Sequence, residues 1–111
     1  MLGLAVGAML AFAVPALAHQ SGSSVSVTAG KPSEFSFTLS TKSVKAGPVT
    51  FKVTNSGKIT HDFSIDHKTT AMLAPGKSAT LTVTLKHGSY PYECTVPGHA
   101  AAGMKGVLKV S

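Results

Sequence analysis

The stretch YPYECTVPGHAAAGMKGVLKV, residues 90–110, joins two alternating segments through a loop of Gly, Pro and Ala. Side chains suited to a core occupy alternate positions on both sides of that loop: Tyr90, Tyr92 and Cys94, then Met104, Leu108 and Val110. Successive side chains of a strand point to opposite faces of a sheet, so each set forms one buried face. The stretch therefore predicts two β-strands connected by a loop of turn-forming residues.

The same alternation of apolar and polar residues runs through the chain from residue 25 onward. The apolar sets are Val25 and Val27; Phe35, Phe37 and Leu39; Val49, Phe51 and Val53; Phe63 and Ile65; and Leu81, Val83 and Leu85. Turn signals separate these sets, as at residues 46–48, 55–57 and 74–76. Many short strands with frequent turns predict an all-β fold, a Greek-key two-sheet antiparallel sandwich of about seven or eight strands.

The first 18 residues differ in kind from the rest. Leu2 to Ala18 is an uncharged apolar run that ends in Ala16-Leu17-Ala18, a small-x-small cleavage pattern. We interpret residues 1–18 as an export signal, which leaves residues 19–111 as one domain in a periplasmic or other extracytoplasmic compartment. The alternative is an uncleaved membrane anchor, because the run is at the short end of the spanning range and lacks a basic start.

The net charge of +6 comes from ten basic residues against four acidic ones. All ten are lysines, spread singly along residues 31–109, and there is no arginine. Proteins that read nucleic acids cluster Arg and Lys on one element, so this pattern argues against a nucleic-acid partner. It is typical of a soluble basic surface suited to acidic partners.

Cys94 is the only cysteine, so it has no partner for a disulfide within the chain. It is followed by His99 in a Pro-Gly-His turn and by Met104 at the start of the last strand. His61 lies in register with the predicted core positions Phe63 and Ile65, so it is the best second histidine. A thiolate, two imidazoles and a more distant thioether form the site of electron-transfer copper proteins.

Simpler interpretations exist for each residue alone. A lone cysteine is usually a small buried hydrophobic residue, and a methionine on a strand usually fills a core. The combination in one loop, with an inward histidine upstream, is better explained by a metal site. The remaining histidines, His19, His67 and His87, are expected to be surface imidazoles.

Three segments, NSGKITHDFSI, LAPGKSATLTV and YPYECTVPGHAAAGMKGVLKV, resemble the small blue copper proteins of the plastocyanin–azurin type, the cupredoxins. The resemblance covers about Val49 to Val110 and makes residues 19–111 a cupredoxin-like domain. It implies one copper ion with His61, Cys94 and His99 as equatorial ligands and Met104 as the axial ligand. The Cys-x4-His-x4-Met spacing is similar to that of auracyanin- or rusticyanin-like members.

The position after the first histidine departs from the family, which often has Asn there. Asp62 can accept hydrogen bonds from the Cys94–Thr95 loop but has no amide donor. Its negative charge would favour Cu(II) and lower the reduction potential. Val96, which is not proline, leaves a backbone N–H for the sulfur, and such a bond usually raises the potential.

The resemblance implies a carrier of single electrons between redox partners. We expect a monomer without enzymatic activity, and partners that are acidic or have an apolar docking patch. Its own patch would consist of Ala100, Ala101 and Ala102 around His99, extended by Leu73, and would suit brief contacts. Catalysis would need further domains, a second cysteine or an orienting residue that the sequence does not provide. A periplasmic copper carrier or resistance protein, with a chelating His19 terminus, is the alternative.

Overall fold

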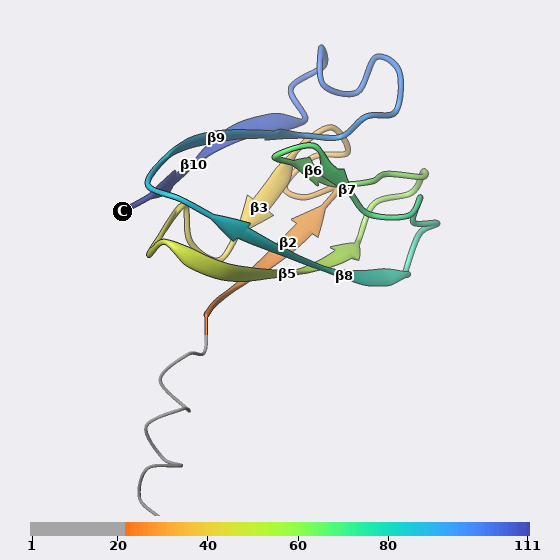
Figure 1. Ribbon diagram of the computed structural model, residues 1–111. Coiled ribbons are helices and arrows are strands. Elements are labelled where there is room, and N and C mark those ends of the chain that lie inside the picture. Colours follow the sequence, from red (N-terminus) through yellow and green to blue (C-terminus); the bar gives the residue numbers. More distant parts are fainter. Residues whose placement is uncertain (1–21) are drawn as a thin grey trace, which may run out of the picture.

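The computed structural model describes residues 22–111, which form two sheets packed face to face (Figure 1). One sheet has the strand order β4 (Ser43–Val44), β10 (Lys105–Val110), β9 (Gly88–Glu93), β6 (Ser64–Ile65) and β7 (Lys68–Thr69). The other has the order β3 (Phe37–Leu39), β2 (Ser23–Ala29), β5 (Gly47–Asn55) and β8 (Ser78–Leu85). The predicted all-β, two-sheet sandwich is confirmed. The predicted signal at residues 1–18 and His19 lie outside the described residues.

The expectation of purely antiparallel sheets is wrong, because each sheet contains one parallel pair. β2 runs parallel to β5, with Val25 opposite Phe51, and β4 runs parallel to β10. The chain leaves β2 through β3, crosses to β4 in the other sheet, and returns as β5 beside β2. Such a crossing between layers lets two strands of one sheet point in the same direction. The described residues contain nine strands, because β4, β6 and β7 are separate two-residue pairings.

The core lies between the sheets and is built from the alternating positions that the sequence indicated. Phe63 is fully buried at its centre. Its ring centroid lies 5.2 Å from that of Phe51 and 5.5 Å from that of Tyr92. Each such side chain contributes about 1.5–3 kcal/mol by leaving water. This core holds the two sheets in a fixed relation, and thereby fixes the loops at their ends.

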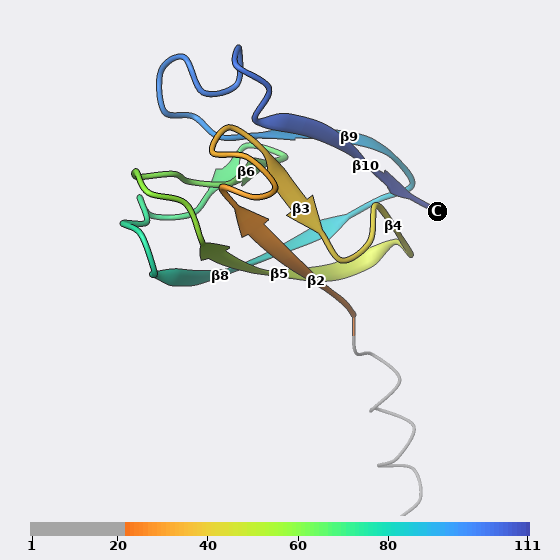
Figure 2. The same cartoon turned by 180° about the vertical axis from the view of Figure 1, so that it is seen from behind.

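Phe35 is not a strand residue, contrary to the alternation. It is 37% exposed and lies in the loop between β2 and β3. Gly30 starts this loop with a φ of +87°, and a Cβ there would lie 2.5 Å from the Cα of Gly57. The loop therefore packs closely on the loop after β5 and interrupts the period-two pattern. Figure 2 shows it beneath the long loop between β9 and β10.

The loop between β9 and β10 projects from one end of the sandwich (Figure 1). Its two ends are joined by a hydrogen bond from the Cys94 N–H to the Met104 carbonyl, at 3.1 Å. The Met104 N–H in turn donates to the His99 carbonyl at 3.1 Å. The backbone of the loop therefore brings the cysteine, the histidine and the methionine close together. Within residues 22–111, no helix has the length and apolar character needed to cross a membrane.

Candidate metal centre

Three metal-ligating side chains from two separate segments converge at this end of the sandwich. His61, Cys94 and His99 each offer a ligand atom, and these atoms all lie within 4.8 Å of one another. The two histidine Nδ1 atoms are 3.1 Å apart, and the Nδ1 of His99 is 3.6 Å from the Cys94 sulfur. Their exposed fractions are 0%, 1% and 9%. The donors face a common point that is shielded from water.

His61 is held by an isolated bridge rather than by a regular strand. Its N–H donates to the Leu73 carbonyl at 3.1 Å, and the Leu73 N–H donates back at 2.8 Å. The sequence placed His61 in register with the strand positions Phe63 and Ile65, but β6 starts only at Ser64. The reason is that the Phe63 N–H donates to the Thr70 hydroxyl and the Asp62 N–H points to the Cys94 sulfur. Side chains thus take up backbone groups that a continuous strand would pair.

The Cys94 sulfur accepts a hydrogen bond from the Asp62 N–H, with a nitrogen–sulfur distance of 3.4 Å. Burial raises the pKa of the Cys94 thiol above its ordinary value of 9.0, and the N–H groups of Asp62 and Val96 partly oppose that rise. The metal-free protein therefore carries a neutral thiol near pH 7. Binding of a metal ion by the thiolate releases this proton.

Asp62 ties the histidine segment to the cysteine loop, as the sequence predicted. Its carboxylate accepts a hydrogen bond from the Thr95 N–H at 2.6 Å and another from the Thr95 hydroxyl. Asp62 itself is only 2% exposed. The two ligand-bearing segments are therefore fixed to each other through protein contacts alone.

Met104 is fully buried and packs in one apolar cluster with Cys94 and Ala29. Phe37 and Val96 cover this cluster from the side. The thioether is thus on the inner side of the loop, next to the cysteine, where the sequence placed it. A buried methionine at this position is available as a further soft donor.

His99 is the most exposed of the three converging residues, and its ring packs edge-on against Phe35, with the centroids 5.0 Å apart. Burial, followed by the charge of His61, lowers the pKa of His99 below its ordinary value of 6.5. The imidazole is therefore neutral at neutral pH. A neutral imidazole has a lone pair available for a metal ion.

Glu34 is a site residue that the sequence did not reveal. Its Oε2 lies 2.6 Å from the Nε2 of His61, on the side of the ring away from Cys94 and His99. The Lys58 N–H and the bond to His61 lower the pKa of Glu34 below its ordinary value of 4.5, so it is a carboxylate near pH 7. The only feature of the sequence that could have drawn attention to Glu34 is that it is one of four acidic residues in a basic chain. The contact itself depends on loop packing.

The predicted docking patch needs one correction. Ala101 and Ala102 are exposed and Ala100 is half-buried, but Leu73 is only 4% exposed. Leu73 pairs with His61 and belongs to the main hydrophobic cluster, so it cannot contribute to a surface. The exposed large apolar residues of the described region are Phe35, Ile59, Met72 and Val107. Of these, Phe35 contacts His99.

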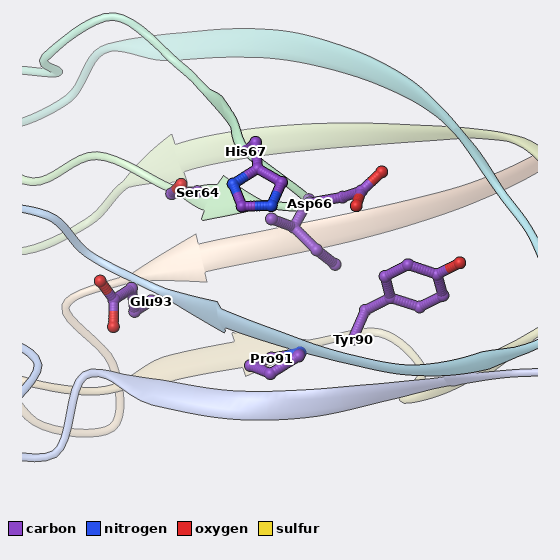
Figure 3. A pocket seen from close by; sticks show the side chains of 7 residues that line it. Ser64, Asp66, His67, Tyr90, Pro91 and Glu93 are labelled. Atoms are coloured by element: carbon purple, nitrogen blue, oxygen red, sulfur yellow. The ribbon is translucent and has the colours of Figure 1, made fainter.

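A separate hollow lies between the β6–β7 turn and β9 (Figure 3). It has a volume of about 400 Å³, and its lining includes His67, Asp66, Tyr90, Pro91 and Glu93. None of the four predicted ligands lines it. His67 and His87 are both exposed, as expected of surface imidazoles.

Two imidazoles, a thiolate and a nearby thioether suit a soft or borderline transition metal. A family model described as copper binding proteins of the plastocyanin/azurin family matches residues 4–111. The chain belongs to this family. Copper is its cofactor, and His61, Cys94 and His99 have the arrangement of a type 1 copper site.

Individual cupredoxins support the same family and fold. Auracyanin-B from Chloroflexus aurantiacus is 54% identical over 43 residues, which are 38% of this chain and 18% of that protein. A solved structure of auracyanin B aligns with a TM-score of 0.67 and 26% identity, over 82% of this chain and 91% of that one. Rusticyanin from Thiobacillus ferrooxidans aligns with a TM-score of 0.68 and 27% identity, over 82% and 79%. The resemblance to auracyanin and rusticyanin is thereby confirmed.

Proposed function

We propose that this protein is an exported type 1 copper protein that passes single electrons between a donor and an acceptor protein. His61, Cys94 and His99 would hold the copper ion, and Met104 would supply a further, weaker thioether donor. The observation that carries this proposal is the buried convergence of the three donors within 4.8 Å. The apolar run at residues 2–18 supports export.

Bound copper supplies the one-electron chemistry by cycling between Cu(II) and Cu(I). The protein contributes a donor set whose geometry does not depend on the metal. The Leu73 bridge holds His61, the Asp62–Thr95 bonds hold the cysteine loop, and the Cys94–Met104 bond closes it. Because these contacts are all between protein groups, they hold the ligand side chains in place when the charge on the metal changes. Small rearrangement favours fast electron transfer.

The surface around His99 supports brief contacts with a redox partner. Ala101 and Ala102 are exposed in the same loop as His99, and the exposed Phe35 packs edge-on against the His99 ring, so this end presents apolar groups. Such a patch suits a weak encounter that buries less than about 1,200 Å². The net charge of +6 favours an acidic partner and faster association at low ionic strength. We propose that the protein acts as a monomer in these encounters.

Voltammetry of the copper-loaded protein tests the electron-transfer role. A reversible one-electron wave, with the same visible spectrum after repeated cycles, is the expected result. A methionine- and histidine-based copper carrier would instead stay pale and give no reversible wave. A pale copper-loaded protein without a reversible wave would therefore contradict the proposal.

A further inference from the structure

The buried ring of His61 has a partner on each side. Its Nδ1 faces His99 at 3.1 Å, whereas its Nε2 faces the Glu34 carboxylate at 2.6 Å. A carboxylate oxygen can only accept a hydrogen bond, so the Nε2 must carry a hydrogen. The carboxylate therefore selects the form of His61 in which Nδ1 offers its lone pair toward Cys94 and His99.

Glu34 is itself held in place from a second direction. Its carboxylate oxygens accept hydrogen bonds from the Lys58 N–H at 2.8 and 3.0 Å, and Oε2 also receives the Ile59 N–H at 3.4 Å. The side chain is 26% exposed, at a hollow of about 370 Å³ that Lys31 and Lys58 also line. The backbone groups fix the carboxylate, and the two lysines suit its negative charge.

Gly57 leaves the space that this contact needs. A Cβ at Gly57 would overlap the Oε2 of Glu34 and would lie 3.1 Å from the Nε2 of His61. The φ of Gly57 lies outside the range that L side chains avoid, so the available space explains the glycine. The Gly57 N–H donates to Asn55, which is fully buried and fixes this turn. The turn is thus shaped to admit the Glu34–His61 bond.

Resting on the proposed function, we propose that Glu34 is a positioning residue of the copper centre. Its carboxylate holds His61 through Nε2, presents Nδ1 to the metal, and strengthens His61 as a donor to Cu(II). Carboxylate partners of this kind orient metal-binding histidines and raise their basicity. A stronger donor favours the more highly charged Cu(II), so Glu34 lowers the reduction potential of the centre.

The same bond fixes one hydrogen of the site without any metal. The Nε2 of His61 carries the hydrogen that Glu34 accepts, so Nδ1, which faces His99 at 3.1 Å, is the nitrogen left to bind copper.

Nitrogen NMR of the histidine rings in the metal-free protein tests the tautomers without any copper. The wild type is expected to show a hydrogen on the Nε2 of His61 that is hydrogen-bonded to Glu34. Glu34→Ala, and independently Gly57→Ala, should give a mixture of tautomers at His61. A wild-type His61 with hydrogen on Nδ1 and none on Nε2 would overturn the proposal.

The copper-loaded variants provide a second, separate readout. Loss of an outer partner typically weakens metal binding about 10–100-fold. If Glu34→Gln weakens Cu(II) binding tenfold more than Cu(I) binding, the potential rises by about 59 mV for one electron. Asp66→Asn is the control, because it removes an exposed carboxylate in the turn between β6 and β7 and should leave the potential unchanged.

The two proposals fail in different ways. If the wild type binds copper and gives its colour, but Glu34→Gln and Glu34→Ala change neither the tautomers nor the potential, Glu34 has no positioning role and the proposed function stands. If the wild type binds no copper, the proposed function fails, while the NMR result on the metal-free protein still decides the role of Glu34 on His61.

Discussion

The carboxylate of Asp62 accepts two hydrogen bonds from Thr95, one of them from the backbone N–H at 2.6 Å. The same Asp62 donates its own N–H to the Cys94 sulfur at 3.4 Å. One residue next to the first histidine thus joins that segment to the cysteine loop and touches the thiol. These contacts hold the two ligand-bearing segments together without any metal ion.

Asp62→Asn should raise the reduction potential, because it removes a negative charge beside the metal but keeps an oxygen for the Thr95 N–H. Voltammetry of the two copper-loaded proteins measures the change. Asp62→Ala should also lower the free energy of unfolding of the metal-free protein by about 1–3 kcal/mol, since a buried acceptor is lost. Thr95→Val is the control, because it removes only the hydroxyl bond. A potential that does not change in Asp62→Asn would contradict this role of the charge.

The stability of the metal-free protein should decrease on the acidic side. The pKa of His99 is below its ordinary value of 6.5, so the unfolded chain takes up a proton below that pH that the folded chain does not. The pKa of Glu34 is likewise below 4.5, which removes further stability as the pH falls below that value. Denaturant unfolding at several pH values should show this decline. A stability that increases from pH 6.5 to 5 would be inconsistent with a buried neutral His99.

The stability of the metal-free protein should also decrease at alkaline pH, for a different reason. Burial raises the pKa of Cys94 above 9.0, so the unfolded thiol loses its proton above that pH while the folded thiol keeps it. Stability should therefore fall as the pH rises through 9. In Cys94→Ser this decline should be smaller, because a hydroxyl does not ionise in that range. An equal decline in both proteins would assign it to other groups.

Ala101→Asp should slow electron exchange with a redox partner without changing the visible spectrum. Ala101 is exposed near His99, and an aspartate there would place an unpaired charge in an apolar encounter surface. Stopped-flow mixing with the partner measures the rate. Ser89→Asp adds the same charge at the start of β9, the far end of that strand from Cys94, and should leave the rate nearly unchanged. Equal rates in wild type and Ala101→Asp would show that electrons do not pass through this face.

Phe63→Ala should lower the free energy of unfolding by about 3–5 kcal/mol, because it opens a cavity at the centre of the core. Denaturant unfolding of the metal-free protein measures this loss. Val107→Ala is the comparison, since Val107 is 44% exposed and its truncation should cost far less. Similar losses for the two variants would mean that the core is not organised around Phe63.

Much of the fold follows from the sequence because period-two alternation is a local property. Val25, Phe51 and Val83 read as core residues and are buried. The parallel pairing of β2 with β5 depends on where the chain crosses between sheets, and no local pattern records that. Phe35 continues the alternation of Phe37 and Leu39 in the sequence. In the structure, however, it lies in the loop that begins at the Gly30 turn, outside the sheet. Strand periodicity predicts faces, and the connections decide the topology.

The metal site was likewise only partly predictable from the sequence. His61, Cys94, His99 and Met104 were predictable because their side-chain chemistry and spacing combine into one donor set, and the structure brings the first three together. Leu73 was misassigned because an apolar residue in a turn can face either way, and its bridge to His61 turns it inward. Glu34 was missed because its contact with His61 joins loops 27 positions apart. Residues that hydrogen-bond to the metal ligands are determined by tertiary packing, which a local sequence pattern does not reveal.

The addition of Cu(II) to the purified metal-free protein, followed by visible and EPR spectra, tests the central assignment most directly. Coordination by the Cys94 thiolate and two imidazoles predicts an intense blue or green protein with one copper ion per chain, and a pale product for Cys94→Ser. A wild-type protein that stays colourless, or a Cys94→Ser variant with the same colour, would contradict it.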